Sequence, residues 1–145
     1  MDRIVVGVDG SDGSRQALTW AVEEARVHGG TVEAVHVFSY ASQFGYSIDA
    51  MVVPVPPYDE VKASAAKVLD EVLEATVPED AGVEIERHVA EGAAASVLLT
   101  RATNADLLVV GTRGYGGFRG LLLGSVSHQC VTHAPCPVVV VPAPA

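Results

Sequence analysis

The chain has 145 residues, of which 49% are hydrophobic and 19% are charged, which is typical of one globular domain over residues 1–145 and excludes a disordered chain. Its net charge of −9 argues against nucleic-acid binding, because nucleic-acid binders carry basic surfaces. We find no signal peptide and no apolar run of the ~18 residues that a membrane span needs, so we expect a cytoplasmic protein that does not enter a membrane.

Strand and helix patterns alternate along the chain. Short continuous apolar runs indicate strands covered on both faces, and amphipathic stretches that end at Gly29-Gly30 or before Pro78 indicate helices. The predicted strands span residues 3–9, 31–38, 83–89, 107–111 and 137–141. The predicted helices span residues 14–28, 58–76, 93–103 and 125–133. Strands separated by single helices imply right-handed crossovers and therefore a parallel sheet.

Several local features refine this pattern. Ser11 or Asp12 is the expected N-cap of the first helix, and Ser125 is the expected N-cap of the last. Residues 83–89 alternate between apolar and polar, which favours an edge strand. Residues 39–57 form a long loop of the kind that serves as a lid, a binding loop or a mobile segment. The inward face of helix 58–76 is predicted to consist of Val61, Ala65, Val68, Leu69, Val72 and Leu73.

The predicted fold is an open, doubly wound α/β structure with five parallel strands in the order 3-2-1-4-5 and helices on both faces. Ligands of such sheets bind at the carboxyl ends of the strands where the winding direction reverses, here between the first and fourth strands. Asp9 and Gly111 end these two strands and should face each other. Asp9 is then placed to accept a hydrogen bond from an adenine amino group or a ribose hydroxyl. The alternative role for Asp9 is to cap the first helix.

A glycine-rich segment follows the fourth strand and opens onto the last helix. Five glycines lie between Gly111 and Gly120, and Gly124 is a sixth. Glycines let a ligand approach the backbone, and the N-terminus of a helix offers free amide groups, so this arrangement favours phosphate binding. It is not a Walker loop, because the only lysines are Lys62 and Lys67. It is not a dinucleotide fingerprint, because Arg119 occupies the third glycine position and no acid follows.

The charge distribution is uneven. All 18 acidic residues lie at or before Asp106, whereas residues 107–145 contain Arg113 and Arg119 and no acid. A locally cationic end within an acidic protein would attract an anionic ligand. The alternative is that this third of the chain consists only of core strand and loop, with both arginines solvated.

The spacing Gly111-x2-Gly114-x9-Gly124-Ser125 resembles the G-2x-G-9x-G-[S/T] signature of the ATP-binding branch of the universal stress protein family. The segments VGVDGS, ADLLVVGTRG and PCPVVVVP extend the resemblance over nearly the whole chain. The resemblance implies an adenine nucleotide alpha-hydrolase-like fold and an ATP, ADP or AMP ligand, with Mg²⁺ possible beside ATP. The predicted binding residues are Gly7, Val8, Asp9, Val37, Val110, Gly111, Arg113, Gly114, Gly124, Ser125, Val126 and Ser127. The family pattern does not require arginine at position 113, so contact between Arg113 and a phosphate is a prediction from charge alone.

A metal site is not expected. His128, Cys130, His133 and Cys136 match no usual zinc spacing, and His128 and Cys130 would point about 160° apart on a helix. The two cysteines are expected to be ordinary thiols of a reducing compartment.

The sequence favours a nucleotide-responsive stress or regulatory module over a dedicated catalyst, since it shows no nucleophile elbow and no Walker-type lysine. Two alternatives stay open: a module that binds cyclic AMP, and a slow ATPase or phosphoryl-transfer enzyme on the same fold. The adenine nucleotide is the expected small-molecule partner. Residues 137–141 (PVVVV) form an apolar edge strand, and the resemblance implies a homodimer that pairs through this strand.

Overall fold

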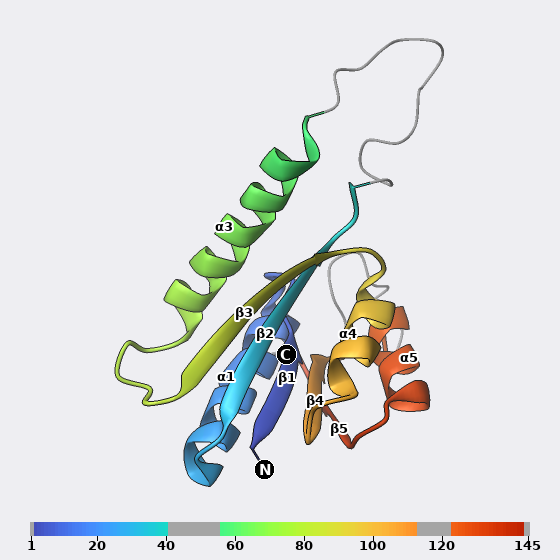
Figure 1. The fold of residues 1–145 in the computed structure, drawn as a ribbon. Coiled ribbons are helices and arrows are strands. Elements are labelled where there is room, and N and C mark those ends of the chain that lie inside the picture. The colour runs from blue at the N-terminus through green and yellow to red at the C-terminus, as the bar shows by residue number, and fades with distance from the viewer. Residues whose placement is uncertain (1, 41–55, 113–122, 144–145) are drawn as a thin grey trace.

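The computed structural model describes residues 2–40, 56–112 and 123–143 of the chain. Its strands are β1 (Arg3–Gly7), β2 (Thr31–Phe38), β3 (Glu84–Glu91), β4 (Leu107–Gly111) and β5 (Val138–Val141). Its helices are α1 (Asp12–His28), α3 (Tyr58–Thr76), α4 (Ala94–Ala102) and α5 (Ser125–His133). All neighbouring strands pair in parallel, in the order β3-β2-β1-β4-β5, which confirms the predicted fold class (Figure 1).

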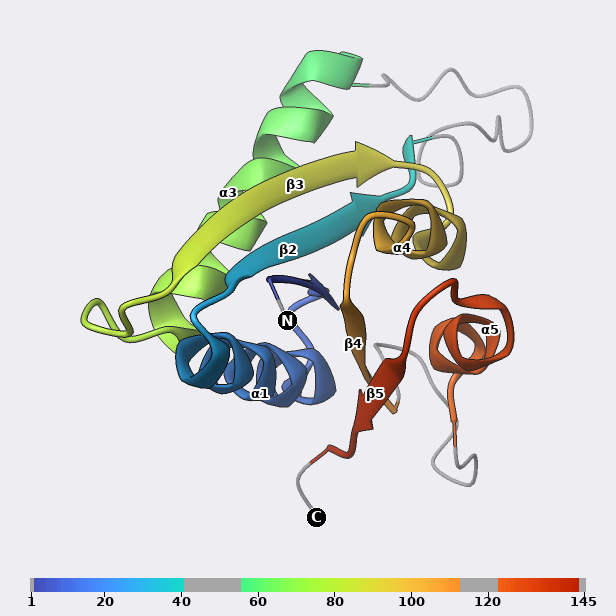
Figure 2. The same cartoon turned by 60° about the horizontal axis from the view of Figure 1, so that its bottom comes forward.

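The sheet separates two layers of helices. Figure 2 shows α1 and α3 on one side of the sheet and α4 and α5 on the other. Alternate residues of each strand enter different cores because side chains alternate across a strand. In β1, Ile4 and Val6 pack in the core beneath α1 and α3, whereas Val5 packs in the core beneath α4 and α5. Both faces of the central strands are therefore shielded from solvent, as their continuous apolar runs predict.

The ends of α1 follow its sequence signals. Ser11 is the N-cap, and its side chain accepts a hydrogen bond from the backbone N–H of Ser14 at 3.2 Å. Gly29 closes the helix in the left-handed conformation, with φ of 71°, and its N–H donates to the carbonyl of Ala25. The helix begins at Asp12, two residues before the predicted start, because the cap lies at Ser11.

Besides α1, three predicted strands and one predicted helix have different ends in the structure. β1 stops at Gly7 instead of Asp9, and Pro137 precedes β5 instead of beginning it. β3 extends to Glu91 because β2, its partner, continues to Phe38 and pairs with it to the last residue. α4 is one residue shorter at each end than predicted. The prediction that residues 83–89 form an edge strand is confirmed, since β3 lies at one margin of the sheet.

Val68 does not face inward as predicted, because 41% of it is exposed. α3 lies over β2 and β3 at the margin of the sheet, so the stripe that it buries is narrow. This stripe consists of Ala65, Leu69, Val72 and Leu73. Among the described residues, no helix combines the length and the apolar character needed to cross a bilayer.

Candidate functional site

The start of α1 touches the end of β4. An ideal Cβ on Gly111 would lie 2.8 Å from the backbone carbon of Gly13 and 3.0 Å from its oxygen, so only glycine fits here. Because β1 and β4 pair directly, their carboxyl ends lie beside each other. The prediction that the carboxyl ends of the first and fourth strands lie beside each other is therefore confirmed.

Asp9 lies in the turn between β1 and α1, where it supports the helix cap. Its Oδ1 atom accepts hydrogen bonds from the backbone N–H of Ser11 at 2.9 Å and from the Ser11 hydroxyl at 2.5 Å. The cap of α1 is thus Ser11, and Asp9 orients it. Among the described residues nothing donates to Oδ2, and the side chain is half-buried, so one carboxylate oxygen is left for a ligand.

The end of β2 extends past the end of β1. The N–H of Thr31 donates to the carbonyl of Asp2, and the carbonyl of Val35 accepts from the N–H of Val8, so odd-numbered residues of β2 direct their backbone groups towards β1. By this alternation, the N–H and C=O of Val37 point into the space beyond β1.

His36 ends the pairing between these two strands. Continuation of the ladder would pair the N–H of Val37 with the carbonyl of Val8, but this bond is not formed, and that carbonyl accepts from Nδ1 of His36 at 2.8 Å instead. Nδ1 carries the hydrogen, because a carbonyl oxygen only accepts. Within the described part of the chain, both backbone groups of Val37 are therefore left without a hydrogen-bond partner.

The start of α5 is tied to the end of β4. The N–H of Gly124 donates to the carbonyl of Thr112 at 2.6 Å, and the hydroxyl of Ser127 lies 2.8 Å from the same oxygen. Thr112 in turn donates its N–H to the carbonyl of Val141 at 3.1 Å. Thr112 and Gly124, which flank the glycine-rich segment, are therefore held together by hydrogen bonds.

The prediction that Ser125 caps the last helix is wrong. Gly124 is the N-cap, Ser125 is the first helical residue, and its exposed side chain makes no cap hydrogen bond. Ser127, which is 2% exposed, also directs its hydroxyl back to the carbonyl of Gly124 at 3.1 Å. Because glycine has no capping side chain, the first amides of α5 are left for another acceptor.

The structure brings most of the predicted site residues to one edge of the sheet. Val8 and Val110 are each 4% exposed, so only their backbones are available at this edge, as is that of Gly7 at the end of β1. Half-buried Val126 belongs to the first turn of α5. Arg113 and Gly114 lie outside the described residues, as do Arg119 and residues 41–55 of the predicted loop.

Sequence reasoning missed three residues that shape this edge. Gly13 makes the close approach to Gly111, Thr112 anchors α5, and His36 leaves Val37 unpaired. The paired glycines of the turn Gly10-Ser11-Asp12-Gly13 were a usable signal for close backbone contact. The other two depend on pairings between distant strands and had no local signal.

The histidines and cysteines considered for zinc lie at or near α5. Cys130 is fully buried, and this burial raises the pKa of its thiol to about 11. Cys136 is half-buried, and desolvation likewise raises its pKa. Both are free thiols, whereas His128 and His133 are exposed. Among the described residues no cluster of three metal-ligating side chains occurs.

Sequence comparison matches residues 1–142 to the universal stress protein family. A universal stress protein of Mycolicibacterium smegmatis is 35% identical over 140 residues, which cover 95% of this chain and 45% of that protein. Universal stress protein YxiE of Bacillus subtilis is 33% identical over 148 residues, which cover 97% of this chain and 98% of that one. The chain thus spans about half the length of the mycobacterial relative and nearly all of the Bacillus one.

Comparison of structures agrees with this match. A universal stress protein family protein from Arabidopsis thaliana, solved with AMP bound, is 25% identical and superposes with a TM-score of 0.65. The superposition covers 100% of this chain and 94% of that one. Family model, sequence relatives and fold all agree, and the chain belongs to the universal stress protein family.

Proposed function

We propose that this domain binds an adenine nucleotide across the carboxyl ends of β2, β1 and β4. The observation that carries the proposal is that two sets of unused backbone groups border this edge: the N–H and C=O of Val37, and the first amides of α5. The AMP-bound relative from Arabidopsis thaliana supports the same class of ligand here.

The adenosine half would lie near β2 and β1. A backbone N–H and C=O that point the same way match a neighbouring acceptor and donor on the edge of adenine, and Val37 offers this pair. Oδ2 of Asp9 is available to accept from a ribose hydroxyl or from the adenine amino group. The backbones of Gly7, Val8 and Val110 would line the floor between these contacts.

The phosphate half would lie at the start of α5. The amides of Ser125, Val126 and Ser127 belong to the first helical turn, which carries the positive end of the helix dipole. Gly111 and Gly124 border this turn without side chains. Arg113 and Gly114 follow Thr112 directly in the chain, and we propose that they contact the phosphates as well.

The glycine spacing favours ATP with Mg²⁺ on its phosphates, and AMP or ADP would use the same adenosine contacts. The site supplies amides and one carboxylate, which suits ligand sensing better than rapid phosphoryl transfer. We therefore propose a regulatory module in the cytoplasm that responds to nucleotide state. Slow ATP hydrolysis and a preference for cyclic AMP are separate outcomes of the experiment below.

The test replaces one amide of α5 without disturbing the helix. Ser125→Pro removes the N–H of the first helical residue, a position that accepts proline, and Gly124 already has the extended backbone (φ −72°, ψ 172°) that precedes proline well. We expect binding of AMP and ATP, measured by calorimetry, to weaken about tenfold, because one charged hydrogen bond is lost. Adenosine should bind the variant and the wild type equally.

Ser125→Ala is the matched control, since it keeps the amide and removes only the hydroxyl. If it weakens AMP binding as much as Ser125→Pro does, the amide is not the contact. Wild-type protein that binds none of ATP, ADP, AMP and cyclic AMP would refute the proposed function. Tighter binding of cyclic AMP than of ATP would favour the cyclic-nucleotide module, and release of ADP from bound ATP would favour slow hydrolysis.

A further inference from the structure

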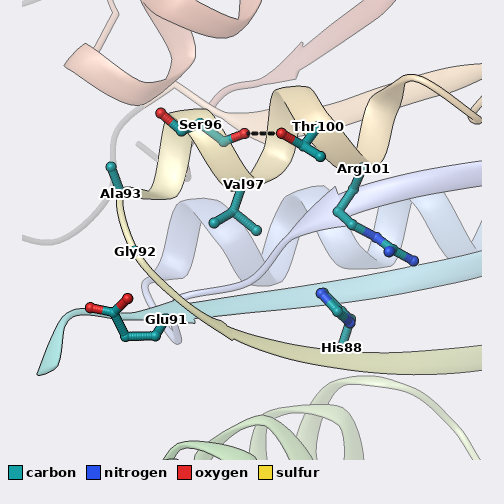
Figure 3. Close-up of a pocket in the computed structure, with 8 residues that line it drawn as sticks. All are labelled: His88, Glu91, Gly92, Ala93, Ser96, Val97, Thr100 and Arg101. Carbon is teal, nitrogen blue, oxygen red and sulfur yellow. Dashed lines mark hydrogen bonds between the residues drawn. The ribbon is translucent and has the colours of Figure 1, made fainter.

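A groove of about 390 Å³ lies between β3 and α4 (Figure 3). Its volume is within the usual range of small-molecule sites. None of its lining residues belongs to the nucleotide site proposed above. The lining residues are His88, Glu91, Gly92, Ala93, Ser96, Val97, Thr100 and Arg101.

The groove exists because α4 does not reach the margin of the sheet. Within the sheet, α4 packs mainly on β1 and β2, so β3 extends beyond it. His88 is paired with Val35 in the sheet, and Val35 packs in the core beneath α4, so the His88 side chain rises from β3 on the α4 side. In Figure 3, Arg101 descends from α4 towards the level of His88, whereas Glu91 lies at the other end of the groove.

A row of alternating charges ends at this groove. Nη1 of Arg3 lies 3.0 Å from Glu86, and its Nη2 pairs with Glu33. The other oxygen of Glu33 accepts from Nε of Arg101 at 2.5 Å. The carboxylate of Glu33, only 1% exposed, is thus shared by two guanidinium groups. Glu86 balances the Arg3 end of the row, and no acidic side chain of the described residues pairs with the outer side of Arg101.

The guanidinium group of Arg101 is held in place, but not all of its hydrogen-bond donors are used. Its bond to buried Glu33 uses only Nε, and its Nη1 and Nη2 atoms have no hydrogen-bond partner in the described part of the chain, with 37% of the side chain exposed. The ring nitrogens of His88 likewise have none there. An anchored guanidinium presents a planar set of donors that matches a carboxylate, and its rigidity reduces the entropy lost on binding.

We propose that the β3–α4 groove binds a small organic monocarboxylate as a second ligand of this protein. The carboxylate pairs with the free Nη atoms of Arg101 and accepts a hydrogen bond from His88. The hydrocarbon part lies against Val97 and Ala93. A phosphate dianion fits less well, because one unbalanced guanidinium offsets only one charge and Glu91 borders the far end.

Titration with valerate, followed by amide chemical shifts in an NMR spectrum, tests the proposal. In wild-type protein we expect saturable shifts at residues 91–101, none with isosteric 1-pentanol, and weaker or no shifts with inorganic phosphate. Arg101→Gln should weaken valerate binding about tenfold or more. Arg87→Gln is the matched control. It also removes one positive charge, but this arginine lies on β3 and pairs with Asp70, so valerate binding should not change.

A second variant is needed because Arg101→Gln also removes one of the two partners of buried Glu33 and could destabilise the fold. His88→Phe keeps the charge row intact and removes the second donor to the carboxylate, so it should weaken valerate binding without removing a partner of Glu33. The proposal is wrong if valerate shifts no groove amide at any tolerated concentration, if phosphate binds more tightly, or if Arg87→Gln weakens binding as much as Arg101→Gln. Saturating AMP should leave valerate bound, and displacement by AMP would contradict a separate site.

Discussion

Gly111 and Gly13 show how single residues hold the proposed site in shape. The backbone of Gly111 needs no unusual conformation, and what excludes a side chain there is the backbone of Gly13 at 2.8 Å. Backbone cannot move aside as the tip of a side chain can, so the contact tolerates no added carbon. Close packing of these two glycines keeps the start of α1 directly beside the end of β4.

Gly111→Ala should therefore lower the free energy of unfolding by about 1–3 kcal/mol through overpacking. Gly7→Ala is the matched control, because its new Cβ would meet only the side chain of Leu98, whose nearest carbon, Cδ1, lies at 3.0 Å and can shift more easily than backbone. We expect a change within about 1 kcal/mol for this control. Urea unfolding of both variants measures the difference, and equal losses would contradict the proposed role of Gly13.

Among the contacts between elements, Asp106 links the amino end of β1 to the amino end of β4. Its Oδ2 accepts from the backbone N–H of Asp2 at 2.8 Å and of Arg3 at 3.0 Å, and its own N–H donates to the Arg3 carbonyl. The bonds from Arg3 and Asp2 lower the pKa of this carboxyl. The ionised carboxylate thus stabilises the pairing of β1 with β4.

A lowered pKa in the folded state gives stability that is present above the unfolded pKa of about 3.9 and is lost as pH falls through the folded value. Asp106→Asn should therefore be less stable than wild type near neutral pH, and the difference should vanish in acid. Asp80→Asn, an exposed residue in the turn after α3, is the control for the charge change. Chemical unfolding across pH 2–7 measures both, and a difference that grows in acid would contradict this role.

Elements with clear local boundaries could be predicted from sequence. The bounds of β2, α3, β4 and α5 agree with prediction. Gly29-Gly30 precede β2, Pro57 and Pro78 flank α3, Gly111 ends β4 and Gly124 precedes α5. Boundaries set by a neighbouring strand could not: β3 runs on to Glu91 because β2 continues to Phe38. In the same way, the position of Asp9 at the site followed from strand order, whereas the free backbone of Val37 depends on the distant bond between His36 and Val8.

At the scale of the whole molecule, β5 is the second margin of the sheet. The carbonyls of Pro137 and Val141 accept from β4, so the backbone groups of Val138 and Val140 point outwards by alternation. An apolar strand with outward backbone groups readily pairs with another strand. We propose that two copies of the chain pair through β5 about a two-fold axis.

Val140→Pro should yield a monomer, because it removes an outward N–H and leaves the pairing with β4 intact. Val89→Pro makes the same change on β3, whose odd-numbered residues point outwards at the opposite margin, and should leave the dimer unchanged. Light scattering at micromolar concentration distinguishes the two forms. A wild-type monomer, or dimer loss with Val89→Pro alone, would refute pairing through β5.

The hydrogen bond between Gly124 and Thr112 has a consequence for how the protein can change. Thr112 and Gly124, the described residues on either side of positions 113–122, are held together by this bond, so we expect the fold to tolerate a change in the number of residues between them. Doubling the length of such a segment costs only about 0.6 kcal/mol. We expect a Gly-Ser insertion after Gly117 to leave the thermal midpoint nearly unchanged, whereas the same insertion between Gly29 and Gly30 should lower it clearly. If this prediction holds, residues 113–122 can be replaced while the sheet is kept, and the ligand of the proposed site can be changed without redesign of the fold.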